Sequence, residues 1–179
     1  SYRRFHEDRT ISLQQLKGLV ELARLSPSAR NLQPLKFILS HDSRKNAAIF
    51  SCLAWAGYLK DWPGPEEGER PSAYIIILGD GSLTKDFGCD HGIAAQSILL
   101  GATETGLGGC ILGNIQRDRL KALLKIPDRY EILLVVALGA PKEEVIIDEV
   151  KEGDIKYWRD ADKVHHVPKR SRGELILKI

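Results

Sequence analysis

Four glycines surround a short apolar run in the segment Gly106-Leu107-Gly108-Gly109-Cys110-Ile111-Leu112-Gly113. Glycine at this density indicates that the backbone itself must approach another group closely, so we expect a ligand beside this loop. A dinucleotide-binding Gly-x-Gly-x-x-Gly motif would need glycine at position 111 and would follow a strand rather than a helix. The Gly-Lys-Ser/Thr of a phosphate-binding P-loop is absent from the sequence. The glycines therefore predict a different kind of ligand contact.

The more reactive side chains do not form a familiar catalytic group. His165 and His166 are adjacent, and neighbouring side chains of an extended backbone point to opposite faces, so they are not expected to share a metal ion. Cys110 is interpreted as a small buried thiol beneath the glycines rather than as a nucleophile. Residues that could bind a cofactor and tune its reactivity, but that have no reactive side chain of their own, suit a site where the cofactor carries out the reaction.

Two loops could contribute to such a site. The loop Ser26–Pro34 is rich in residues that make local hydrogen bonds, and its nine residues exceed most connections between elements. An ordinary helix-to-strand connection would explain its composition equally well. A second loop, 61–71, contains three prolines and is either a mobile cover over a pocket or an exposed excursion.

Composition limits the class of protein. A chain of 179 residues can bury a substantial core, and we take residues 1–179 as a single domain. The content of 43% apolar and 28% charged residues is that of a soluble globular protein. The net charge of +2 is too small to favour nucleic acid or a membrane as partner. Three cysteines without Cys-x-x-Cys spacing indicate neither disulfides nor zinc and favour the reducing cytoplasm.

A helix beginning at Asp90 organises the chain. Asp90 is its expected N-cap, and Gly106 supplies the stop signal. Between Gly92 and Ala102 its polar side chains are limited to Gln96 and Ser97. A helix that is apolar nearly all round is buried, so this one is expected at the centre of the fold or in a subunit interface.

The remaining elements follow from hydrophobic periodicity and turn residues. Ser12 is the expected N-cap of the first helix. Two strands are uniformly apolar and therefore expected to be buried on both faces. The predicted helices are 13–25, 41–57 and 116–125, and the predicted strands are 35–39, 73–80 and 132–139.

Five stretches, in chain order, resemble the motifs of the nitroreductase family of FMN-dependent oxidoreductases. The first of these stretches, Ser1–Phe5, lacks the arginine with which the family's motif begins. The five are Ser1-Tyr2-Arg3-Arg4-Phe5, the A-x-x-x-P-S-x-x-N-x-Q-P segment Ala23–Pro34, the helix Asp90–Ala102, the glycine loop Gly106–Gly113, and Leu138-Gly139-Ala140-Pro141.

The resemblance implies an α+β fold in which helices wrap a central mixed sheet, and an intertwined homodimer with the flavin at the interface. It implies that NADH or NADPH reduces FMN at N5, and that a nitroaromatic, quinone or similar acceptor then uses the same pocket in a ping-pong mechanism. Reductive dehalogenation or flavin fragmentation on the same fold remains an alternative. A flavin-binding dimer without turnover remains another.

The resemblance also assigns cofactor-binding residues, and neither a catalytic side chain nor a metal ligand is among them. They are Ser1, Tyr2, Arg3, Pro27, Ser28, Asn31, Gln33, Leu112, Gly113, Lys169 and Arg170. The N-terminal residues would contact the ribityl phosphate and the pyrimidine side, where Arg3 would stabilise negative charge on the reduced ring. The loop residues would reach the isoalloxazine of the partner's flavin. Leu112 and Gly113 would offer backbone N–H groups to N5 and O4. The two late cations would bind the phosphate, with Arg172 as a competing candidate.

Overall fold

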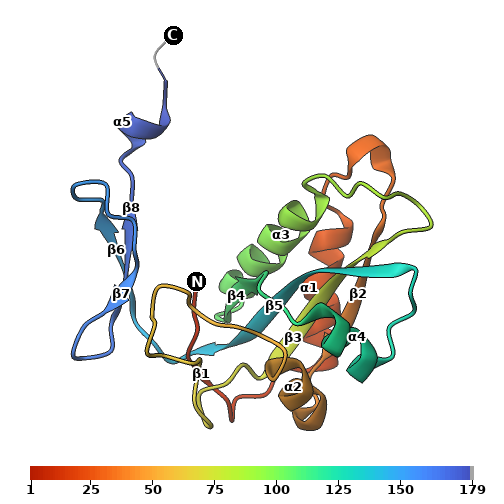
Figure 1. Ribbon diagram of the computed structural model, residues 1–179, viewed down its shortest axis with the longest axis horizontal. Helices are drawn as coiled ribbons and strands as arrows, with labels where there is room; N and C mark the ends of the chain where they lie inside the picture. The colour runs from red at the N-terminus through yellow and green to blue at the C-terminus, as the bar shows by residue number, and fades with distance from the viewer. Residues whose placement is uncertain (178–179) are drawn as a thin grey trace.

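A five-stranded sheet forms the main body of the molecule (Figure 1). The computed structural model describes residues 1–177. The strand order is β1-β5-β3-β2, and β4 also pairs with β5. The strands are β1 (Phe5–His6), β2 (Leu35–Ser40), β3 (Ala73–Asp80), β4 (Gly108–Leu112) and β5 (Tyr130–Pro141).

The α+β class is confirmed, but the expectation of a mixed central sheet is corrected. Every pairing described in this sheet is antiparallel. Within residues 1–177 the parallel pairing lies in a second, small sheet, where β6 (Val145–Glu149) runs alongside β8 (His165–Lys169).

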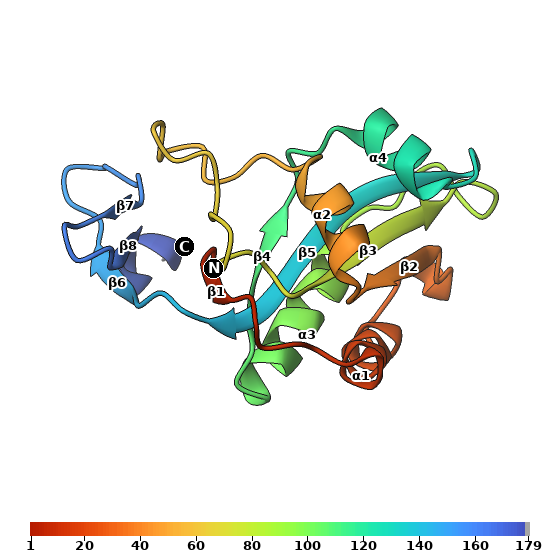
Figure 2. The same cartoon turned by 90° about the horizontal axis from the view of Figure 1, so that it is seen from below.

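Helices cover both faces of the main sheet (Figure 2). On one face lie α1 (Leu13–Arg24) and α3 (Asp90–Glu104), and on the other lie α2 (Ser43–Phe50) and α4 (Arg117–Leu124). Alternate residues of β3 enter the two resulting cores, with Ile75 in one and Ile76 in the other. All eight residues of β3 are buried, which confirms the prediction from its uniformly apolar sequence.

Helix ends follow local chemistry. The predicted cap of α1 is confirmed, since Ser12 and Gln15 form a capping box. The stop of α3 is also confirmed: Gly106 has φ of 76°, its N–H donates to Thr103, and Leu107 N–H donates to Ala102 at 2.8 Å. This is a Schellman arrangement, which a left-handed glycine permits. The start of α3 is corrected, because Asp90 is its first residue and Cys89 is the cap.

The predicted glycine loop is a strand. Gly108–Leu112 pair with β5 as β4, and a Cβ at Gly109 would lie 2.6 Å from the carbonyl oxygen of Ala137. The glycines at 108 and 109 therefore allow close packing within the protein, rather than serving a ligand alone.

The second predicted helix is shorter than its sequence suggests. It ends at Phe50, although the pattern extended to residue 57. The following backbone bonds to a distant segment instead: Ala54 N–H donates to Asn114 at 3.1 Å, and Gln116 N–H donates to Cys52 at 2.8 Å. These non-local bonds satisfy backbone groups that a longer helix would have paired internally.

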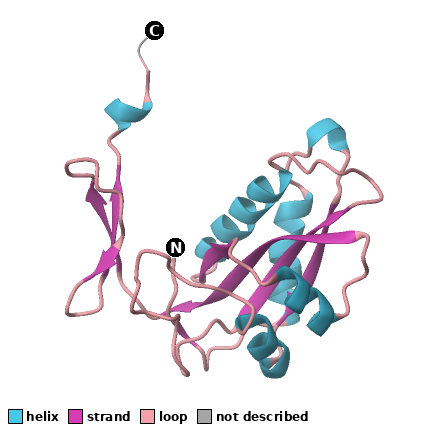
Figure 3. Ribbon diagram, in the orientation of Figure 1, coloured by secondary structure: helices cyan, strands magenta, loops and turns pink. Residues whose placement is uncertain are grey.

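The C-terminal part forms an arm beside the main body (Figure 3). Its sheet has the order β6-β8-β7, with β7 at Trp158–Arg159, and the short helix α5 (Arg172–Leu175) follows. Arg159 joins the arm to the body, because it donates to the buried carboxylate of Glu143 at 2.8 Å and lies 4.1 Å over the ring of Trp62. The loop 61–71 thus packs partly against the arm. Within residues 1–177 no helix combines the length and the hydropathy needed to cross a membrane.

A half-buried ion pair ties the N-terminal segment to the body. Arg4 donates from Nε and Nη2 to the two oxygens of Glu69, each at 2.6 Å, and Lys142 Nζ lies 3.0 Å from the same carboxylate. The bonds from Arg4, supported by Lys142, lower the pKa of Glu69 from 4.5 to about 2. A bidentate pair of this kind is among the stronger polar contacts in proteins.

We expect Glu69→Gln to lower the free energy of unfolding at pH 7 by roughly 3 kcal/mol, because Arg4 would lose its charged partner. The pKa is lower in the folded than in the unfolded chain. The pair therefore stabilises fully above about pH 4.5, and that contribution disappears as the pH falls toward 2. Urea unfolding at several pH values measures both effects. Glu67→Gln, at an exposed neighbouring position, is the control; equal stability of the two variants at pH 7 would contradict this account.

Candidate functional site

The predicted N-terminal residues lie along the outer edge of β4. Tyr2 N–H donates to the carbonyl of Gly109 at 3.0 Å. Arg3 Nη1 bonds to Nε2 of His165 at 2.9 Å, its guanidinium lies 4.7 Å over the ring of Tyr157, and its Nε is buried without a partner. The site therefore includes His165 and Tyr157 from the arm, which sequence patterns did not single out as neighbours of Arg3.

The two C-terminal cations predicted to bind the phosphate, Lys169 and Arg170, lie in different surroundings. Lys169 is the last residue of β8, and the first residue of the same strand, His165, bonds to Arg3. Arg170 instead pairs with Glu174 at 3.3 Å in an exposed position. The structure thus groups Lys169, and not Arg170, with Arg3.

The end of β4 presents backbone groups to the same edge. Because the carbonyl of Gly109 faces Tyr2, alternation along an antiparallel strand turns the N–H of Leu112 toward β5, where Leu112 is opposite Val135. Gly113 follows the last paired residue and is exposed. Of the two predicted donors, the geometry favours Gly113 for a ligand beside the edge.

The adjacent histidines face opposite ways, as predicted. His165 contacts Arg3, whereas Nδ1 of His166 lies 2.9 Å from Asp148 and its ring stacks on Trp158 with centroids 4.0 Å apart. Across residues 1–177, no three His, Cys, Asp or Glu side chains are grouped closely enough to hold a metal ion.

The polar loop after α1 is held in an uncommon backbone conformation. It includes the short 3-10 helix η1 (Ala29–Asn31), and three of its residues have positive φ: 52° at Arg30, 56° at Asn31 and 51° at Gln33. Each such non-glycine conformation costs of order 1–3 kcal/mol and persists when the surroundings enforce it. Strain of this kind is often found at binding sites.

Asp90 enforces that conformation. Its carboxylate, only 4% exposed, accepts from Ser28 Oγ at 2.6 Å and from Ala29 N–H at 3.1 Å. Ser28 Oγ in turn accepts from Gln33 N–H at 2.9 Å. Sequence reasoning interpreted Asp90 as a helix cap and missed this role, because the partners lie in a loop far back in the sequence.

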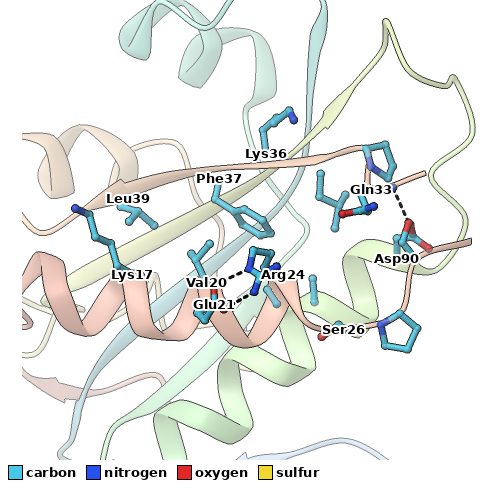
Figure 4. Close-up of a pocket in the computed structure, with 16 residues that line it drawn as sticks. Lys17, Val20, Glu21, Arg24, Ser26, Gln33, Lys36, Phe37, Leu39 and Asp90 are labelled. Carbon is cyan, nitrogen blue, oxygen red and sulfur yellow. Dashed lines mark hydrogen bonds and ion pairs between the residues drawn. The ribbon is translucent and has the colours of Figure 1, made fainter. Parts of the chain in front are cut away.

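A cavity of about 400 Å³ lies between α1, β2, this loop and the start of α3 (Figure 4). Its inner surface is mainly apolar, and three cations from α1 and β2 surround it. The lining includes Pro27, Ser28, Gln33 and Asp90, the apolar residues Val20, Leu35, Phe37 and Leu39, and the cations Lys17, Arg24 and Lys36.

The two groups of predicted residues are not brought together in one chain. The N-terminal residues lie near β1 and β4, whereas η1 lies at the far end of the molecule, beyond α1 and β2 (Figure 1). A site that used both groups would therefore need a second copy of the chain.

The sequence predicts α3 either at the centre of the fold or in a subunit interface, and in the single chain α3 is buried on one face only, which does not fit the first alternative. Ala94, Ala95 and Ile98 pack against the sheet, but the opposite face is open and Leu100 is 61% exposed. Gln96 on the same open face is uncharged, and the charged side chain that follows on this face, Glu104, is the last residue of the helix. From Gly92 to Thr103 this surface therefore lacks the charged side chains of an ordinary exposed helix.

Comparison with known proteins identifies the family. Residues 1–64 and 74–140 match the model of the nitroreductase family. A protein of Archaeoglobus fulgidus, provisionally named NADH dehydrogenase/NAD(P)H nitroreductase, is 31% identical over 170 residues, which cover 90% of each chain.

Solved structures agree with this match. An FMN-dependent nitroreductase from Clostridium difficile superposes with a TM-score of 0.66 at 26% identity, covering 80% of this chain and 84% of that one. An NADPH:FMN oxidoreductase from Vibrio harveyi, solved with NAD⁺, has the same fold, with a TM-score of 0.63 at 23% identity over 80% of this chain and 65% of that one. Fold, sequence match and motif order together place this chain in the nitroreductase family.

Proposed function

We propose that this protein is an FMN-dependent NAD(P)H oxidoreductase whose flavin sites are each built by two copies of the chain. When bound, FMN supplies the redox chemistry, taking a hydride from NADH or NADPH and delivering electrons to a nitroaromatic, quinone or similar acceptor. The observation that carries the proposal is the guanidinium of Arg3, which has no carboxylate partner among the described residues and follows Tyr2, the residue bonded to Gly109 of β4.

The residues at this edge fit a flavin nucleotide. A phosphate monoester and a reduced flavin ring are both anionic, and positive charge is supplied by Arg3 and by Lys169, which ends the strand whose first residue contacts Arg3. The backbone N–H of Gly113 is available to a ring acceptor at the same edge. Cationic side chains and fixed backbone dipoles stabilise developing negative charge without reorganisation, so these groups would favour reduction of a bound flavin.

The partner would complete the site with its polar loop. Asp90 and Ser28 fix the loop backbone, so the side chains of Asn31 and Gln33 would be oriented before a ligand arrives. A pre-shaped loop loses little freedom on binding and would exclude water from one face of the ring. A single pocket that serves donor and acceptor in turn would give ping-pong kinetics.

The homodimer is supported by the open face of α3. An exposed leucine on a helix face whose residues from Gly92 to Thr103 are all uncharged is typical of a surface that another chain covers. A second copy packed there would restore the all-round burial that the sequence of α3 predicts.

Two further proposals concern the whole chain. We treat the arm and the main body as one domain, which the Arg159–Glu143 and Arg3–His165 contacts across them support. A cytoplasmic location is supported by Cys52, Cys89 and Cys110, which are all free thiols.

Purified protein is expected to be yellow, with a flavin spectrum that bleaches when NADH or NADPH is added without oxygen. Subsequent addition of a nitroaromatic or a quinone should restore the colour, because reduction by the nucleotide and oxidation by the acceptor take place on the same bound flavin. Anaerobic absorbance spectroscopy measures each half-reaction. A bound flavin that neither nucleotide reduces would exclude the reductase activity.

Arg3→Ala should weaken FMN binding by roughly 10-fold or more, since a hydrogen bond to a charged group contributes about 1.5–3 kcal/mol. Arg4→Ala is the matched control, because Arg4 is already committed to Glu69. That variant should lose thermal stability but bind FMN nearly as well in its folded fraction. Fluorescence titration gives the affinities, and equal losses in both variants would refute the assigned roles.

A further inference from the structure

The guanidinium of Arg3 is charged but not neutralised. Among residues 1–177, no ion pair or side-chain hydrogen bond joins it to a carboxylate. The nearest acid, Glu143, accepts from the backbone N–H of Arg3 and uses its other oxygen for Arg159 at 2.8 Å. Arg3 keeps its full positive charge because guanidinium does not lose its proton in proteins.

The acceptor that Arg3 does have is a neutral ring. Because arginine can only donate, Nε2 of His165 must accept, which places the ring's proton on Nδ1. His165 is 0% exposed. Burial, and then the charges of Arg3 and Arg159, lower its pKa to about 4. The neighbouring His166 acts in the same direction, so the ring stays neutral at physiological pH.

Packing fixes this acceptor. The ring of His165 lies against Tyr157, with centroids 5.3 Å apart, and the same tyrosine lies beneath the guanidinium of Arg3. Tyr157 also packs at an interplanar angle of 54° against Tyr58, with centroids 4.9 Å apart. Arg3 is therefore oriented by an aromatic face and a neutral nitrogen, neither of which cancels its charge.

We propose that His165 is a positioning residue that presents Arg3, with its charge intact, to an anionic part of the flavin nucleotide. This inference rests on the proposed function. A carboxylate at position 165 would orient Arg3 equally well but would neutralise it, whereas an apolar ring would leave its charge but not its direction. A neutral acceptor provides both.

Three substitutions separate orientation, charge and packing. His165→Gln keeps a neutral acceptor, His165→Phe keeps a ring but loses the acceptor, and His165→Glu keeps an acceptor but adds negative charge. His166→Gln, on the opposite face of the same strand, is the matched control. Dissociation constants for FMN and for riboflavin, and the midpoint potential of bound FMN, are measured on each protein after circular dichroism confirms folding.

His165→Gln should stay within about twofold of the wild type, whereas the Phe and Glu variants should lose about tenfold or more. If Arg3 contacts the phosphate, the loss appears for FMN but not for riboflavin. If Arg3 contacts the ring, the variants bind reduced flavin more weakly while their affinity for oxidised flavin changes less. A tenfold difference between these two affinity changes corresponds to about 30 mV in the two-electron midpoint potential. Either result supports the proposal.

A packing role predicts the reverse order, with His165→Phe close to the wild type and His165→Gln impaired; that order would overturn the proposal. So would unchanged affinity and potential in both the Phe and Glu variants, or an equal effect of His166→Gln. If His165→Glu does not fold, the comparison of Gln with Phe still decides. Wild-type protein that binds no FMN at all would instead remove the proposed function itself.

Discussion

The pairing of β5 with three other strands is the constraint on which the arrangement depends. Its bonds to β1 and β4 bring the N-terminal residues beside the glycine-containing strand, so Tyr2 meets Gly109 although they are far apart in the sequence. Its bonds to β3 form the interior that both helix layers cover. The candidate site is therefore located on an edge strand that pairs with the buried strand β5, and a regular element of this kind suits precise placement of a ligand.

Of the three arginines near the edge strand β4, two are paired with a carboxylate within the described part of the chain and one is not. Glu69 pairs with Arg4, and Glu143 pairs with Arg159, so these two cations serve the fold. Arg3, which directly precedes Arg4 in the sequence, contacts a neutral imidazole instead. A buried or half-buried cation is normally paired, because desolvation of an isolated charge is costly. A cation that is held in place and left unpaired is best explained by an anionic ligand, and the family assignment makes a flavin nucleotide the natural one.

Structural features that depend on residues close together in the chain could be predicted from the sequence, whereas features that depend on hydrogen bonds between distant segments could not. The uniformly apolar β3, the Ser12 cap and the Gly106 stop all depend on residues close in the chain, and all were predicted correctly. The early end of α2 and the strand character of β4 depend on backbone partners from other segments. Asp90 was misinterpreted for the same reason, since its carboxylate bonds to the loop at Ser28. The resemblance assigned the candidate site residues, and the structure separates those candidates into two groups.

Because the two groups of candidate residues lie apart in one chain, our central claim is that a single chain cannot form a complete flavin site. Two chains together would form two such sites. Native mass spectrometry of the purified protein tests it most directly, because it counts chains and cofactors in one spectrum. We predict a dominant species of two chains with two FMN, and loss of flavin whenever the chains are separated in the instrument. A single chain that retains one FMN would contradict the account.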